Sequence, residues 1–173
     1  MIEIRIANQT DDVEVLALLG RVTYSESHAH FIDDKKDLLK YSDATFSISK
    51  TKEELNNPNI LFYLLYSDGF PIGFTKLVLN STNENIISTK VCCLERIYIL
   101  DDFIPLKVGQ KLLDFTVKTV KELEFEILWL SVYVKNDRAI RFYERNGFEN
   151  VGVLNFIVNG KEYKNIVFSK KLQ

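Results

Sequence analysis

The chain has 173 residues, of which 46% are hydrophobic and 27% are charged, with a formal net charge of -2 at pH 7. This length predicts a single domain over residues 1–173 with a substantial core. A surface that follows a phosphate backbone needs a basic excess, so the charge argues against a nucleic-acid partner. A cationic substrate is compatible with the same charge.

Cysteine usage and the N-terminal segment indicate where the protein works. Cys92 and Cys93 are adjacent in the sequence, so on a strand they would point to opposite faces and a disulfide between them would be strained. We therefore expect small core thiols and a reducing, cytoplasmic setting. The first residues, "MIEIRI", alternate as a strand does and do not resemble a secretory signal. Because no apolar run approaches the ~18 residues that span a bilayer, we expect no membrane partner.

Hydrophobic periodicity in the N-terminal half predicts a strand, several helices and a hairpin. Residues 2–7 alternate as a half-buried strand, and residues 10–22 have the spacing of an amphipathic helix. The polar segment 31–57 predicts two short helices. The second of these carries a capping-box signature, Ser49 or Thr51 with Glu54. Two apolar runs then flank Asp68-Gly69, which is a hairpin signal.

The C-terminal half predicts strands separated by two longer helices. "KVCCLERIYIL" is a strand, a loop and an amphipathic helix follow it, and "EILWLSVYV" is a nearly continuous apolar run typical of a central strand. "NDRAIRFYERNGF" predicts a helix that ends at Gly147, and two last strands surround Asn159-Gly160. The expected fold is α/β with a mixed sheet.

This order of elements, with "LERIYI", "WLSVYVKN" and "NDRAIRFYERNGF", resembles the GNAT family of acetyltransferases and, within it, the PaiA-type polyamine N-acetyltransferases. The match covers most of residues 91–150 well and the N-terminal half loosely. The resemblance implies an α/β GNAT fold with a mixed, mostly antiparallel central sheet of about seven strands and about four helices. This sheet is expected to be splayed between strands 4 and 5. It also implies that a primary amine attacks acetyl-CoA directly, without an acyl-enzyme and without a metal.

The resemblance assigns the cofactor to two segments. Splayed strands leave backbone N–H groups unpaired, so the backbone of Ile97, Tyr98 and Ile99 is expected to face acetyl-CoA and to stabilise the developing oxyanion. The diphosphate is expected at the start of the following helix, where N–H groups and the helix dipole favour an anion. The residues expected at that loop and helix start are Ile104, Lys107, Val108, Gly109, Gln110 and Lys111.

The loop before this helix departs from the family pattern. Relatives usually carry Gln/Arg-x-x-Gly-x-Gly/Ala, whereas this chain has "IPLKVG", in which only Gly109 is kept. Ile104 replaces the Gln/Arg, and Lys107 replaces the middle glycine. The Lys107 side chain would crowd the backbone approach of the phosphates, or its ammonium would pair with a phosphate oxygen.

The helix after the central strand carries the remaining expected roles. Ala139, Phe142 and Tyr143 share one helical face, and Asn136 can cap the helix start. In an isolated helix Tyr143 would be a core residue. By the resemblance, these four residues bind the cofactor, and Tyr143 is the general acid or the stabiliser of the leaving thiolate. Glu95 is the expected general base, acting through a water.

The acceptor is left open by the sequence. Several carboxylates of the N-terminal helices and the 80–90 connector could line a cationic pocket: Glu26, Asp33, Asp34, Asp37 and Glu84. His28 and His30 are expected to be surface histidines rather than metal ligands, because two ligands alone are weak support for a metal site. A small-molecule amine, with spermidine or spermine favoured, is the first reading. The alternatives are a protein or peptide amine, or a non-catalytic CoA-binding or interaction module. A homodimer is compatible with the family, although no interface is identifiable.

Overall fold

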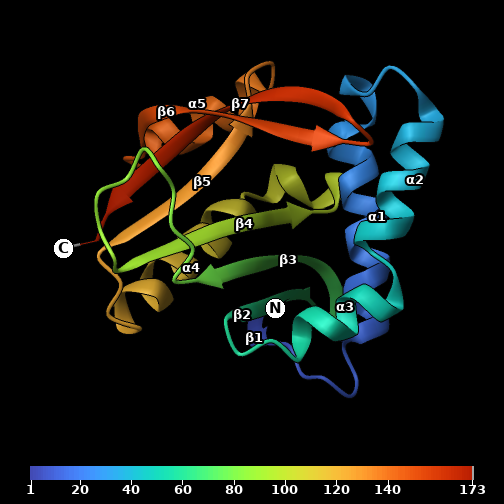
Figure 1. Cartoon of the computed structure of the whole chain (residues 1–173). Coiled ribbons are helices and arrows are strands. Elements are labelled where there is room, and N and C mark those ends of the chain that lie inside the picture. Colours follow the sequence, from blue (N-terminus) through green and yellow to red (C-terminus); the bar gives the residue numbers. More distant parts are fainter. Residues whose placement is uncertain (173) are drawn as a thin grey trace. The chain divides into compact units, whose positions relative to one another are not determined.

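The computed structural model describes residues 1–172, which form an α/β fold in which helices accompany a mixed β-sheet (Figure 1). The seven strands are hydrogen-bonded in the order β1-β2-β3-β4-β5-β7-β6. This confirms the predicted sheet, and the described residues form five α-helices where the expected fold has about four. The elements are β1 (Ile2–Ile6), α1 (Val13–His28), η1 (Ala29–Phe31), α2 (Lys35–Thr45), α3 (Ile48–Leu55), β2 (Ile60–Ser67), β3 (Phe70–Leu79), β4 (Val91–Ile99), η2 (Asp101–Leu106), α4 (Val108–Glu122), β5 (Ile127–Tyr133), α5 (Asp137–Arg145), β6 (Glu149–Val158) and β7 (Lys161–Lys171), where η marks a 3-10 helix.

The chain forms two compact units, and each is described by itself. The first unit is Met1–Leu77 with Arg96–Thr116, and the second is Val78–Glu95 with the described residues from Val117 onward. β3, β4 and α4 each contribute residues to both units. That residues 1–173 act as one domain stays a prediction.

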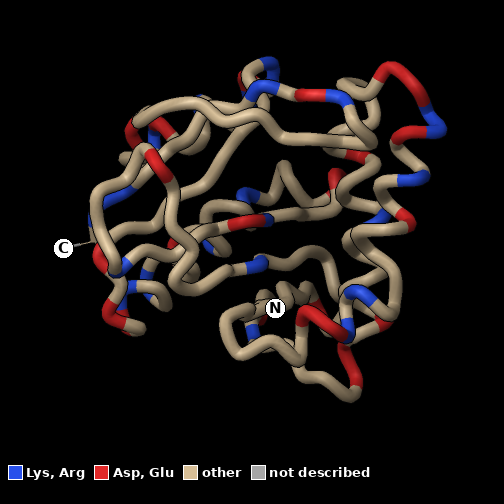
Figure 2. The backbone as a smooth tube through the Cα atoms, viewed as in Figure 1, with Lys and Arg blue, Asp and Glu red and all other residues tan. Residues whose placement is uncertain are grey.

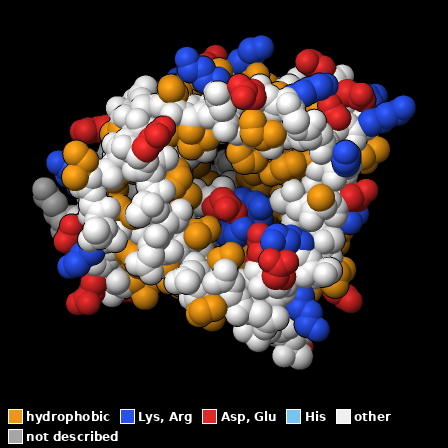
Figure 3. Space-filling view, viewed as in Figure 1, with side chains coloured by type: hydrophobic (Ala, Val, Ile, Leu, Met, Phe, Trp, Pro, Cys, Tyr) orange, Lys and Arg blue, Asp and Glu red, His pale blue; other side chains and the backbone are white. Residues whose placement is uncertain are grey.

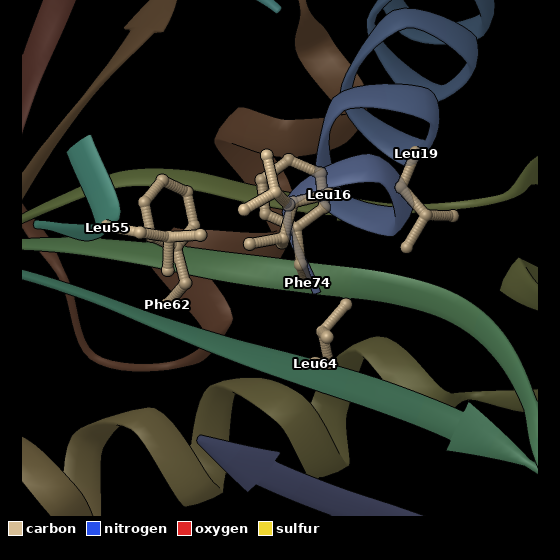
Figure 4. Packing of buried hydrophobic residues seen from close by; sticks show 7 residues of the cluster. Leu16, Leu19, Leu55, Phe62, Leu64 and Phe74 are labelled. Atoms are coloured by element: carbon tan, nitrogen blue, oxygen red, sulfur yellow. The ribbon is translucent and has the colours of Figure 1, made fainter. Parts of the chain in front are cut away.

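Two apolar clusters form the core of the first unit. In one, Leu16 and Leu19 of α1 pack with Phe62 and Leu64 of β2 and with Phe74 of β3 (Figure 4). In the other, the first turns of α4 pack on the strands through Val108 and Leu112, with Leu65, Ile72, Ile97 and Ile99. Since Tyr98 packs in the first cluster and its neighbours in the second, the end of β4 has the alternation expected of a strand covered on both faces.

The second unit is built on β5 and β7. β4 and β5 run parallel, with Val91 opposite Ile127, and β7 pairs antiparallel with both β5 and β6. Cys93 and Trp129 lie in its core, and the Trp129 indole donates to the Ser81 carbonyl at 2.7 Å, which holds the connector that follows β3. Cys92 and Cys93 are both buried thiols outside any disulfide, as expected, and burial raises the pKa of the Cys92 thiol to about 12.

Local turn chemistry agrees with the sequence, whereas one cap does not. Both hairpin turns have positive φ at their two central residues: 49° and 80° at Asp68-Gly69, and 48° and 81° at Asn159-Gly160. The predicted cap of α3 at Ser49 or Thr51 is wrong, because Ser47 accepts from the Lys50 N–H at 3.1 Å. Glu54 lies near the end of α3 and takes no part in capping its start. Its partner is described below.

Charge is mixed along the helices and over the surface. Acidic and basic residues alternate with neutral ones along α1, α2 and α3 (Figure 2), and both signs lie interspersed on the face drawn in Figure 3. Within residues 1–172, no helix has both the length and the apolar character that crossing a membrane requires.

Candidate active site

The end of β4 lies so close to β3 that only glycine fits at one position. Leu100 donates its N–H to the Ile72 carbonyl at 2.9 Å. A Cβ built on Gly73 would lie 2.5 Å from the Tyr98 carbonyl oxygen, which is backbone and cannot move aside. Gly73 therefore sets the position of the strand end that carries Ile97, Tyr98 and Ile99, the residues predicted to face the thioester.

The predicted phosphate loop turns at Lys107. This residue follows η2 and has φ 57° and ψ 21°, the left-handed conformation that glycine adopts most readily. Its N–H donates to the Ile104 carbonyl at 3.1 Å, and its own carbonyl accepts from Gln110 at 3.2 Å. The lysine thus takes the backbone conformation that the family's middle glycine favours, and α4 begins directly after it.

Residues of the first turn of α4 divide into packing and exposed positions. Val108 is buried in the core, and Gly109 faces Ile99, whose Cδ1 lies 3.4 Å from a Cβ built on the glycine. Gln110 donates to Asp114 at 2.8 Å. Lys107 and Lys111 are exposed. Two ammonium groups and a helix N-terminus in one turn form an arrangement that suits an anion.

α5 is held at both ends as the sequence predicted. The Asn136 side chain accepts from the Ala139 N–H at 3.1 Å, so its capping role is confirmed. At the other end, Gly147 has φ 76° and its N–H donates to the Glu144 carbonyl. These contacts fix the helix in the second unit, and a contact between Asn136 and the cofactor stays a prediction.

Tyr143 is a packed residue of α5. Its side chain is 7% exposed, and its ring is T-shaped to Phe142 at 5.3 Å and to Phe148 at 5.5 Å between ring centroids. Such edge-to-face packing fixes the plane of the phenol. Glu95 is exposed and belongs to the same unit as Tyr143, whereas residues 97–111 belong to the first unit. Which of the predicted residues meet around a substrate therefore stays a prediction.

An aromatic cluster in the first unit was missed by the sequence reasoning. His28 stacks on Tyr24 with centroids 4.5 Å apart and planes 14° apart, and it meets Tyr98 edge-on at 5.9 Å. Tyr41 and Phe46 complete the cluster around Tyr24, at 4.9 and 5.6 Å. The expectation of a free surface histidine is wrong for His28, which is half-buried and packs on these rings. Its burial lowers the pKa of the imidazole to about 4. The i, i+4 spacing of Tyr24 and His28 was the available signal.

A buried ion cluster in the same unit was also missed. Glu54 of α3 accepts from the Lys76 ammonium at 2.7 Å, and the Arg96 guanidinium lies 3.5 Å from its other oxygen. Arg96 also covers the Phe46 ring at 4.9 Å. No local sequence pattern predicts this cluster, because its members come from α3, β3 and β4.

Glu26 and Asp34, two of the candidate acceptor carboxylates, have structural roles. Glu26 accepts from the Asp101 N–H at 3.0 Å, which joins the end of α1 to the start of η2. Asp34 accepts from the Lys36 N–H and caps α2. Asp33, Asp37 and Glu84 stay candidates for contact with a cationic acceptor.

Comparisons with known proteins agree with this arrangement. The sequence model of the acetyltransferase (GNAT) family matches residues 24–148. An uncharacterized N-acetyltransferase of Lactobacillus delbrueckii subsp. lactis is 24% identical over 161 residues, which cover 93% of this chain and 92% of that protein. The crystal structure of PaiA N-acetyltransferase from Thermoplasma acidophilum, in complex with coenzyme A, has a TM-score of 0.77 at 25% identity and covers 99% of both chains. The ribosomal-protein-S18-alanine N-acetyltransferase of Escherichia coli shares the fold, with a TM-score of 0.69 at 16% identity over 100% of this chain and 95% of that one.

Proposed function

The chain belongs to the GNAT family of acetyltransferases and is an N-acetyltransferase, and on that premise we propose that it acetylates a small primary amine, with spermidine or spermine the favoured acceptor. The amine attacks the thioester of acetyl-CoA directly. The proposal draws on the PaiA-type motifs in the sequence and on the likeness to PaiA of Thermoplasma acidophilum, which was solved with coenzyme A. The reaction needs no metal, because an amine that has lost its proton is a sufficient nucleophile for a thioester.

The observation that carries cofactor binding is the left-handed conformation of Lys107 at the start of α4. This conformation supports a loop that still turns at Lys107, although the glycine of the family pattern is replaced there. We assign the diphosphate to the segment from Ile104 to Lys111, with Val108 as packing and the two lysines as charge. The thioester carbonyl is assigned to the backbone at Ile97, Tyr98 and Ile99, and the pantetheine arm to the face of α5 that carries Asn136, Ala139 and Phe142.

The acid–base roles follow from the chemistry of the attacking amine and of the leaving thiolate. A primary amine with a pKa near 10.4 is neutral in only about one molecule in 2,500 at pH 7, a cost of about 4.6 kcal/mol. Glu95 is assigned as the base that offsets this cost through a water. Tyr143 is assigned as the donor to the departing thiolate.

The proposed setting is a reducing compartment, the cytoplasm. Support comes from the two cysteines, which are adjacent, buried and not joined in a disulfide. The carboxylates Asp33, Asp37 and Glu84 are the remaining candidates for contact with a polyamine's second ammonium group.

A thermal shift with acetyl-CoA is the first test. At 100 times its Kd, acetyl-CoA is expected to stabilise the protein by about 2.7 kcal/mol, which is an easily measured rise in Tm. A thiol-release assay over spermidine, spermine, amino acids and peptides then identifies the acceptor. The absence of any shift at millimolar acetyl-CoA would favour a non-catalytic module instead, and release with peptides alone would exclude the polyamine.

Replacing Lys107 tests the phosphate loop. Lys107→Gly is expected to raise the free energy of unfolding by about 1 kcal/mol, because it removes a non-glycine residue from the left-handed region. The same change is expected to weaken acetyl-CoA binding several-fold through loss of the ammonium. Both quantities are measured by urea unfolding and by isothermal titration.

Lys107→Asn is the matched control, since asparagine tolerates the left-handed conformation without a charge. Both variants should show a weaker salt dependence of acetyl-CoA binding than the unchanged protein. If Lys107→Gly binds acetyl-CoA as tightly as the unchanged protein, or more tightly, the lysine does not pair with a phosphate.

A further inference from the structure

The tautomer of His28 follows from the hydrogen bonds around it. The Ser27 hydroxyl has one proton, which it donates to the Thr23 carbonyl at 2.8 Å, with the Tyr24 carbonyl at 3.3 Å. His28 Nδ1 lies 2.6 Å from the same hydroxyl oxygen. With the hydroxyl proton on the Thr23 carbonyl, the tautomer that satisfies this second contact has its proton on Nδ1, which donates to Ser27.

The other ring nitrogen of His28 is therefore an acceptor. A neutral imidazole with its proton on Nδ1 has a lone pair on Nε2. The ring is neutral near pH 7, because burial lowers its pKa to about 4. Stacking on Tyr24 and the edge contact with Tyr98 fix the plane of the ring.

The contact between His28 and Tyr98 relates this histidine to the proposed reaction. Tyr98 contributes its backbone to the strand end that the proposed function assigns to the thioester, and its ring lies against His28 with centroids 5.9 Å apart. Both residues belong to the first unit. The His28 ring thus lies beside the strand at which the acyl group is proposed to sit.

We infer that His28 is a positioning residue for the acceptor, whose amine N–H donates a hydrogen bond to Nε2. This rests on the proposed function and deepens it. A neutral primary amine has two N–H bonds and one lone pair, so one N–H can bind Nε2 while the lone pair attacks the thioester carbon. The step is a hydrogen bond and transfers no proton to the ring. The inferred ligand class is a primary amine with a free N–H donor.

Nitrogen NMR of the histidine side chains tests the geometry directly. The chain has two histidines, so His30→Asn assigns the spectrum of His28 without changing the aromatic cluster. We expect Nδ1 to give a protonated-type signal and Nε2 an unprotonated one. Addition of spermidine together with coenzyme A should move the Nε2 signal toward the hydrogen-bonded range. A protonated-type Nε2 signal, or an Nε2 signal that stays unchanged at saturating amine, overturns the inference.

Steady-state kinetics of two His28 variants separate positioning from folding. In His28→Asn the amide group matches Nδ1 and can still reach Ser27, but nothing replaces Nε2. His28→Gln is longer and carries its amide near the Nε2 position. We expect kcat/KM for the amine to fall about tenfold in His28→Asn, the size of one lost hydrogen bond, with partial recovery in His28→Gln.

Acetyl-CoA binding distinguishes the inference from the function on which it rests. The thermal shift with acetyl-CoA should be the same in His28→Asn, His28→Gln and the unchanged protein. A kcat/KM for the amine within twofold of the unchanged protein in His28→Asn overturns the role of His28 alone. Failure of the unchanged protein to release thiol with any amine overturns both.

Discussion

Replacing Lys76 with alanine is expected to lower the free energy of unfolding by about 3–5 kcal/mol, because it removes one partner of a buried ion pair. The Lys76 side chain is 3% exposed and its ammonium lies 2.7 Å from Glu54 Oε1. The Phe62 ring lies 5.9 Å from the ammonium, so the pair is in apolar surroundings. Without Lys76, the Glu54 carboxylate keeps Arg96 at 3.5 Å but loses its shorter contact.

Urea unfolding of Lys76→Ala measures this loss, and Lys50→Ala is the matched control. Lys50 also pairs with a glutamate at 2.8 Å, but its side chain is 42% exposed and that of Glu53 is 70% exposed. Exposed pairs contribute about 0–1 kcal/mol, so the control should be nearly neutral. If both variants lost the same free energy of unfolding, the buried Lys76 pair would contribute no more to stability than the exposed Lys50 pair.

The sequence predicted the elements of the fold well because their signals are local. A two-residue hairpin turn needs positive φ at both central residues. Asp68-Gly69 and Asn159-Gly160 both have it, so both predicted turns are present. Asn136 and Gly147 mark the ends of α5 in the same way. Each of these features depends on a few neighbouring residues, so no knowledge of the tertiary structure was needed.

The site was less predictable because its contacts join distant parts of the chain. Glu54, Lys76 and Arg96 are separated by 20 or more residues, and each looks like a surface charge by itself. His28 was placed at the surface for the same reason, since only the packed structure brings Tyr98 to it. Lys107 was the reverse case. Its side chain suggested a broken loop, but a single lysine can occupy the left-handed conformation at a modest cost.

The largest expected effect on activity is that of Tyr143→Phe, which should lower kcat at least about tenfold while acetyl-CoA binding persists. The leaving thiolate has an ordinary pKa near 8.5 and a tyrosine near 10, so full proton transfer is uphill by about 2 kcal/mol. A hydrogen bond from the phenol to the sulfur needs no such transfer and strengthens as negative charge develops. Phenylalanine removes this donor and keeps the ring.

Packing makes the variant a clean test of the hydroxyl group. The Tyr143 ring meets Phe142 and Phe148 edge-on, and phenylalanine preserves both contacts. The matched control is Tyr163→Phe, because Tyr163 of β7 also packs edge-on against an aromatic ring, that of Tyr133, and has no proposed role in the reaction. Thiol release under saturating amine, with the thermal shift by acetyl-CoA as the binding measure, compares the two variants. A kcat in Tyr143→Phe equal to that in Tyr163→Phe would leave Tyr143 as a core residue of α5, and the thiolate would then have to leave without a tyrosine donor.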